Sequence, residues 1–192
     1  IDPTCGSGTF CIEAAMMARQ IAPGLRRTFS FEDWNWVDDR LIQEVRTEAS
    51  KKINRDLVLD IMGTDIDARM VEIAKENAQK AGVASDITFK QMRVQDLRSD
   101  KINGVIISNP PYGERLSDDA GVTKLYAEMG EVFAPLTTWS KFILTSDENF
   151  EKKFGRPADK KRKLYNGTLK VDLYQFFGER VRRQSSNEKG SI

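Results

Sequence analysis

The stretch IDPTCGSGTF, residues 1–10, decides the fold of this 192-residue chain. Two glycines, Gly6 and Gly8, follow an apolar residue and Asp2-Pro3, and residues 9–19 then carry apolar side chains at helical spacing. A strand that passes through a glycine turn into a helix is typical of a ligand-binding loop, because glycine lets the backbone approach a ligand and the helix N-terminus faces it. Ile1 has the character of a strand's last residue, so we expect a truncated first strand and a longer parent protein.

Apolar runs and helical patterns alternate along the rest of the chain. This alternation indicates an α/β fold with a doubly wound, Rossmann-like parallel sheet. Two strands around Gly167 predict a C-terminal antiparallel hairpin. We expect strands at residues 57–64, 87–91, 104–108, 141–145, 162–166 and 168–177, and helices at residues 9–19, 39–54, 68–81 and 123–136.

One domain accounts for this length, with two segments set apart from it. We expect the domain to span residues 1–183, with an insertion at about residues 22–54 and a polar tail at residues 184–192. No apolar run approaches the roughly 18 residues of a membrane span, and two cysteines do not form a disulfide framework, so we expect a cytoplasmic protein that does not contact membranes.

The charged and titratable residues exclude several kinds of chemistry. The net charge is only +1, so any contact with nucleic acid must come from local patches or from a partner domain. The chain has no histidine, which removes the commonest general base and the commonest metal ligand. We therefore expect no metal site.

The glycine loop is compatible with few ligands. A phosphate-binding P-loop would need Lys and then Ser or Thr after the second glycine, and Thr9-Phe10 does not supply them. A dinucleotide fingerprint would need Gly or Ala where Cys11 stands. S-adenosylmethionine remains, and a tight turn without a ligand is the alternative. The loop residues expected at this cofactor are Asp2, Thr4, Cys5, Gly6, Ser7, Gly8 and Thr9.

Acidic residues follow two of the predicted strands. Asp65 comes directly off a strand, where a carboxylate can accept hydrogen bonds from a ribose diol, and Ile66 stands beside it. Asp67 is better placed to cap the next helix. Asp96 lies beyond the following strand, in a position to accept from an adenine amino group. We expect Asp65, Ile66 and Asp96 at the cofactor.

Asn109-Pro110-Pro111-Tyr112 follows the apolar strand GVIIS. The lone pair of a base amino group is delocalised into the ring, so the nitrogen is a poor nucleophile. The Asn109 side-chain oxygen and the Pro110 carbonyl are two acceptors that can hold its N–H groups, while Pro111 stiffens the backbone and Tyr112 offers a stacking face. These four residues are the expected catalytic set, with Asn109 also near the cofactor. A proline-stiffened turn is the structural alternative.

The motifs DPTCGSGT, GTDID and NPPYGERL together resemble those of the amino-methyltransferase superfamily. The extended NPPYGERL is most similar to the bacterial 23S rRNA guanine-N2 methyltransferase family, whose members are often labelled N6-adenine-specific DNA methylases. The resemblance covers residues 1 to about 177. It implies a class I methyltransferase fold and an N-terminal THUMP RNA-binding domain in the parent protein.

This resemblance implies transfer of a methyl group from S-adenosylmethionine, leaving S-adenosylhomocysteine, to N2 of a guanine in 23S rRNA. Adenine-N6 methylation of DNA is one alternative, and a non-catalytic RNA-binding module on the same fold is another. The basic residues at 160–163, with Arg180, Arg182 and Arg183, are equally compatible with phosphate contacts and with a solvated surface. For Trp34 and Trp36 we expect buried packing within the insertion, and a position along the cofactor or base pocket is the alternative.

Overall fold

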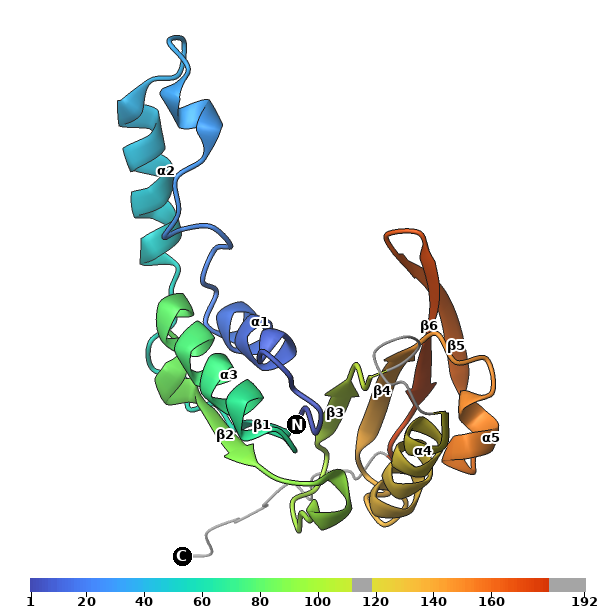
Figure 1. Cartoon of the computed structure of the whole chain (residues 1–192). Coiled ribbons are helices and arrows are strands. Elements are labelled where there is room, and N and C mark those ends of the chain that lie inside the picture. Colours follow the sequence, from blue (N-terminus) through green and yellow to red (C-terminus); the bar gives the residue numbers. More distant parts are fainter. Residues whose placement is uncertain (112–118, 180–192) are drawn as a thin grey trace, which may run out of the picture. The chain divides into compact units, whose positions relative to one another are not determined.

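The computed structural model describes residues 1–111 and 119–179, which form two compact units (Figure 1). The first unit comprises residues 1–97 and 107–111. The second comprises residues 98–106 and the described residues from 119 onward. Each unit is described by itself.

A parallel sheet forms the centre of the first unit. β1 (Ile61–Asp65) pairs in parallel with β2 (Ile87–Gln91), from Ile61 opposite Ile87 to Asp65 opposite Gln91. The first two residues extend this sheet on the other side of β1, since the Asp2 N–H donates to the Met62 carbonyl at 2.9 Å. The N–H of Ile107, in β3 (Val105–Ser108), donates to the Ile1 carbonyl at 3.0 Å. Residues 1–2 therefore hold a strand position between β1 and the end of β3.

Two helices cover this sheet and bury its apolar side chains. α1 (Thr9–Ala18) and α3 (Ala68–Ala81) enclose a core with β2. As predicted, Asp67 caps α3 by accepting from the Arg69 N–H at 2.9 Å. Gly82 ends this helix with a positive φ of 76°. The core residues are Cys5, Cys11, Ile12, Ala15, Val71, Ala74, Ala78, Val83, Ile87 and Phe89.

The strand predicted at residues 57–64 begins only at Ile61, so the first half of that prediction is wrong. The Arg19 guanidinium donates to the carbonyls of Asn54, Arg55 and Leu57, which draws this segment away from the sheet. The same guanidinium forms a bidentate ion pair with the buried carboxylate of Asp86, the last residue of the short η2 turn (Ala84–Asp86). Arg19 thus ties the two ends of the insertion to the body of the unit.

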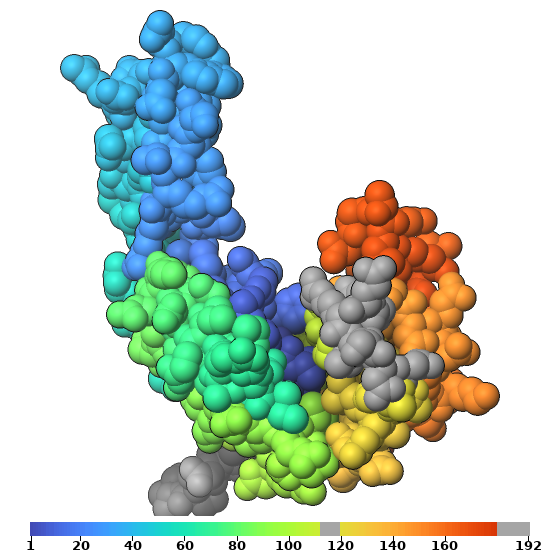
Figure 2. All heavy atoms as spheres, viewed as in Figure 1, coloured from blue at the N-terminus to red at the C-terminus, as the bar shows by residue number. Residues whose placement is uncertain are grey.

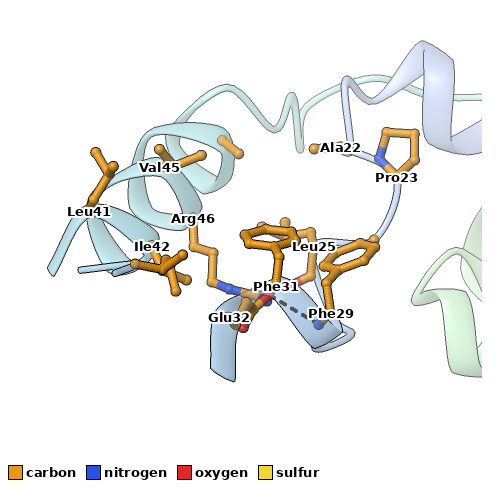
Figure 3. Close-up of a pocket in the computed structure, with 13 residues that line it drawn as sticks. Ala22, Pro23, Leu25, Phe29, Phe31, Glu32, Leu41, Ile42, Val45 and Arg46 are labelled. Carbon is orange, nitrogen blue, oxygen red and sulfur yellow. Dashed lines mark hydrogen bonds and ion pairs between the residues drawn. The ribbon is translucent and has the colours of Figure 1, made fainter. Parts of the chain in front are cut away.

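The insertion contains a short η1 turn (Ser30–Asp33) and the amphipathic helix α2 (Asp39–Lys51). An apolar cavity of about 280 Å³ lies between α2 and the segment around Phe29 and Phe31 (Figure 3). Arg46 reaches from α2 to this segment, donating to the Leu25 and Arg27 carbonyls at 2.7 and 2.6 Å and pairing with Glu32 at 2.6 Å.

The expected burial of Trp34 and Trp36 is wrong. The two side chains are 50% and 78% exposed, and their rings contact each other with centroids 5.1 Å apart. The reason is that the insertion consists of one helix and one irregular segment, and no second layer of secondary structure covers the tryptophans.

The second unit is built on a sheet in the order β3-β4-β6-β5. β6 (Leu169–Phe176) runs antiparallel to both β4 (Ser140–Thr145) and β5 (Lys160–Asn166), which confirms the hairpin around Gly167. α4 (Asp119–Phe133) begins and ends a few residues earlier than predicted. α5 (Phe150–Phe154) was not predicted, because five residues are too short to show a helical period.

None of the helices that the structure describes is both long enough and apolar enough to span a membrane.

Replacing Arg46 with Ala tests how the insertion is held. We expect Arg46→Ala to lower the free energy of unfolding by about 1–3 kcal/mol, because the substitution removes a charged donor from three hydrogen bonds, two of which are partly shielded from solvent. Urea denaturation followed by circular dichroism measures the change. Lys51→Ala, at an exposed position of the same helix, is the control. Equal stabilities of the two variants would show that Arg46 does not hold the insertion.

Candidate functional site

The glycine loop lies directly on the core of the first unit. Gly6 and Gly8 have positive φ values of 51° and 84°, which glycine adopts without strain. A Cβ atom at Gly8 would lie 2.9 Å from Cζ of Phe89 and 3.0 Å from Cβ of Ala74. Gly8 also provides the cap position of α1, since its carbonyl accepts from the Ile12 N–H at 2.9 Å. The sequence IDPTCGSGTF therefore forms the strand–loop–helix passage that it predicts.

Asp65 fixes this loop from the carboxyl end of β1. Its Oδ2 accepts from the Gly6 N–H and its Oδ1 accepts from the Asp67 N–H, each at 2.9 Å. The carboxylate is half-buried. Because each carboxylate oxygen has two lone pairs, both oxygens can still accept one further hydrogen bond, as a diol would supply.

Asp2 and Thr4 connect the loop to β3. The Asp2 carboxylate is 2% exposed and accepts from the Thr4 N–H at 3.1 Å. Burial raises the pKa of Asp2 to about 7, and the Thr4 N–H acts in the opposite direction. The Thr4 hydroxyl forms a 2.6 Å hydrogen bond with that of Ser108, the last residue of β3. The structure therefore brings the loop and the Asn109-Pro110-Pro111 segment together within one unit.

Asn109 carries a buried polar atom without a partner. Its Oδ1 accepts no hydrogen bond from any residue that the structure describes. Leaving a buried acceptor unpaired costs about 1–3 kcal/mol, so such atoms need an explanation, and a functional role is one. Pro110 beside it is buried and Pro111 is half-buried, whereas Tyr112 lies outside the described residues.

The remaining predicted cofactor residues differ in how far they are exposed. Ile66 is 65% exposed, directly after Asp65. Asp96 is exposed at the end of the η3 turn (Val94–Asp96), and its carboxylate has no partner among the described residues. Ser7 and Thr9 are exposed on the loop, with their hydroxyl oxygens 3.3 Å apart. Cys5 is buried, and burial raises the pKa of its thiol well above the ordinary value, which disfavours the reactive thiolate.

Two side chains that the sequence interpretation missed also hold the site. Asn77 of α3 donates to the Ser7 carbonyl at 3.1 Å, and Gln91 of β2 donates to the Ile66 carbonyl at 3.0 Å. Asparagine disfavours helix interiors, so its presence within α3 is a signal from which this tertiary contact could have been predicted. Within residues 1–111 and 119–179, no group of three acidic, cysteine or histidine side chains could hold a metal ion.

The first unit has a parallel sheet. A glycine loop follows its first strand position, an acidic residue follows β1, and an Asn-Pro-Pro segment follows β3. This arrangement defines the class I methyltransferase fold. The chain belongs to the family described as RMKL-like, methyltransferase domain, which matches residues 1–175.

Relatives of known sequence and structure support this assignment. "Putative RNA methyltransferase YpsC" of Bacillus subtilis (strain 168) is 52% identical over 93% of this chain and 46% of its own length. "Ribosomal RNA large subunit methyltransferase K/L" of Shewanella amazonensis is 40% identical over 95% of this chain and 27% of its own length. The crystal structure of "SMU.472, a putative methyltransferase complexed with SAH" is 65% identical, with a TM-score of 0.90 over 94% of this chain and 48% of its own. The chain therefore spans about half or less of these relatives.

Replacing Gly8 with Ala tests the fit of the loop. We expect Gly8→Ala to lower the free energy of unfolding by about 1–3 kcal/mol, because the Cβ would press on Phe89 in a backbone conformation that alanine rarely adopts. Thermal and urea denaturation measure the loss. Gly155→Ala provides a matched control, since Gly155 has a φ of 82° but open space around it. A loss no larger than the control's would contradict the close contact.

Proposed function

We propose that this chain is the catalytic domain of an S-adenosylmethionine-dependent enzyme that methylates the exocyclic amino group of a base in RNA, most specifically N2 of a guanine in 23S rRNA. The observation that carries the proposal is the buried, unpartnered Oδ1 of Asn109, beside a loop that is held by Asp65. The proposed chemistry needs an acceptor of this kind to hold an N–H of the base amino group.

The residues of the first unit fit S-adenosylmethionine. Asp65 keeps free lone pairs for the ribose hydroxyls, Ile66 exposes an apolar side chain for a flat ring, and Asp96 has an unpaired carboxylate for an amino group. The side of this site that faces the amino-acid part of the cofactor would be formed by the loop residues Asp2, Thr4, Cys5 and 6–9. When bound, this cofactor supplies an electrophilic methyl group on a sulfonium sulfur.

The proposed contribution of Asn109 and Pro110 is to orient the nucleophile. Their two oxygens accept hydrogen bonds from the two N–H groups of the base, which localises the nitrogen lone pair and directs it away from the ring. Pro111 restricts the backbone that aims these oxygens, and Tyr112 provides a face for the base. One N–H proton leaves for solvent after the nitrogen has been alkylated.

Catalysis of this kind depends on positioning and electrostatics. It requires neither a strong base nor a metal, which suits a chain without histidine. RNA as the substrate is supported by the names of the relatives, two of which are an RNA and a ribosomal RNA methyltransferase. The THUMP-type domain of the parent protein, the domain bounds at residues 1–183 and the cytoplasmic location stay predictions.

Asn109→Ala tests the proposal. We expect the rate of methyl transfer to fall by about 10²-fold or more, because one of two orienting acceptors is lost. Transfer of tritiated methyl groups from S-adenosylmethionine to protein-free 23S rRNA measures the rate. Mass spectrometry of the digested RNA should reveal N2-methylguanosine.

Stability separates this role from a structural one. Because Oδ1 has no partner among the described residues, Asn109→Ala should not lower the free energy of unfolding. Asn54→Ala, which removes an exposed local hydrogen bond, is the activity control. A wild-type rate in Asn109→Ala would refute the catalytic role, and N6-methyladenine formed in duplex DNA instead would refute the substrate.

A further inference from the structure

The β5–β6 hairpin holds an unusual concentration of positive charge. Residues 160–176 include five basic side chains and one acidic side chain, whereas the whole chain has a net charge of only +1. Four of the basic residues are consecutive, Lys160 to Lys163. Such a local excess attracts polyanions even when the rest of the protein is neutral or acidic.

The position of β5 makes these charges accessible. β5 is the edge strand of the order β3-β4-β6-β5, and the side chains of residues 160–163 are all exposed. Since successive side chains of a strand point to opposite faces, the charges lie on both faces of the edge. The tip of the hairpin lies at the molecular surface (Figure 2).

Only part of this charge is neutralised within the second unit. Lys161 pairs with the buried Asp172 at 3.3 Å, and Lys170 pairs with Glu148 at 2.8 Å. Lys160 and Arg162 form no ion pair with the residues that the structure describes. Lys163 forms none either, although its charge contributes to lowering the pKa of Glu148, which pairs with Lys170. Three cations of β5 are therefore available for a ligand.

An aromatic ring accompanies the cations. Tyr165 is 68% exposed, and it lies opposite Lys170 in the register of the hairpin. By the alternation of the strand, Tyr165 shares a face with Lys163. Cations next to an exposed aromatic ring are the combination that binds single-stranded nucleic acid, through phosphate contacts and base stacking.

Edge strands also carry lysine for another reason, which is to prevent pairing with other sheets. That role explains exposed cations but not the features at the tip, because the exposed Tyr165 and Leu169 add apolar surface to the edge that needs protection. The combination therefore favours a binding surface.

We propose that the β5–β6 hairpin binds the RNA substrate, with Lys160, Arg162 and Lys163 contacting backbone phosphates and Tyr165 stacking on an unpaired base. This inference rests on the proposed function, since it takes the substrate to be RNA. It adds an RNA contact on the second unit, whereas the proposed catalytic residues that the structure describes belong to the first.

Salt-dependent RNA binding by the full 192-residue chain tests the phosphate contacts. The probe is a fluorescein-labelled 20-nucleotide oligo(U), followed by anisotropy from 50 to 200 mM salt. We expect Lys160→Gln/Arg162→Gln/Lys163→Gln to weaken binding about 10-fold or more. We also expect the slope of log affinity against log salt to become shallower by about 2, at ~0.7 per phosphate on a single strand.

The matched control removes three exposed cations from the first unit, in Arg40→Gln/Lys51→Gln/Lys52→Gln. It should retain affinity within about twofold and the wild-type slope. Tyr165→Ala should weaken binding about fivefold or more without changing the slope, and Tyr165→Phe should restore it.

Several outcomes would overturn the proposal. These are an absence of RNA binding by the wild type at 50 mM salt, an unchanged slope in the hairpin variant, or an equal loss in the control variant. Aggregation of the hairpin variant with unchanged affinity would assign the charges to edge protection. Tighter binding to phosphatidylserine vesicles than to RNA would assign them to a membrane surface.

The test is independent of the catalytic proposal. Oligo(U) has no exocyclic amino group, so its binding is measured separately from methyl transfer, and the hairpin variant changes residues remote in sequence from Asn109. If the hairpin inference fails, the triple variant binds RNA as tightly as the wild type and the wild type still transfers methyl groups. If the proposed function fails, the wild type itself transfers no methyl group.

Discussion

The site depends on the carboxylate of Asp65, which accepts one backbone N–H from the glycine loop and one from the start of α3. Charge-assisted hydrogen bonds of this kind are stronger than neutral ones. They join the glycine loop to the turn after β1, so these two segments of the candidate site take one fixed geometry. Asn77 and the Thr4–Ser108 pair extend this network to α3 and to the end of β3. The same carboxylate retains the acceptors that a ribose would need, so the group that builds the site is also suited to bind in it.

Much of the fold could be predicted from periodicity and turn chemistry. α3 and β2 have the predicted bounds, because Asp67, Gly82 and an uninterrupted apolar pattern define them locally. The errors occur where a distant side chain competes with local preference. The apolar residues 57–59 favour a strand, yet Arg19 binds the carbonyl of Leu57 and two carbonyls before it. A contact between residues 35 to 38 positions apart leaves no trace in the local pattern. Trp34 and Trp36 are exposed because the insertion has no second layer of secondary structure to cover them, and composition does not reveal such a lack.

The candidate site was predictable to a different extent. Three candidate residues could be picked out from sequence alone: Gly8 from the turn between a strand and a helix, Asp65 as an acid at the end of a strand, and Asn109 as an acceptor for an amino group. In the structure these three residues belong to one unit. The sequence did not indicate that Asp2 is buried beneath the loop, because burial depends on the strands on both sides of it. Nor could it reveal that Asn109 Oδ1 is unpartnered among the described residues, since the absence of a partner is a property of the assembled core.

The most direct test of the central claim is the binding of S-adenosylhomocysteine, measured by isothermal titration calorimetry for the wild type, Asp65→Ala and Asp67→Ala. Asp67 is the appropriate control because it neighbours Asp65 but caps α3 instead of holding the loop. We predict micromolar binding by the wild type, a loss of more than about 10-fold in Asp65→Ala, and near-wild-type affinity in Asp67→Ala. Undiminished binding by a folded Asp65→Ala variant would contradict the account.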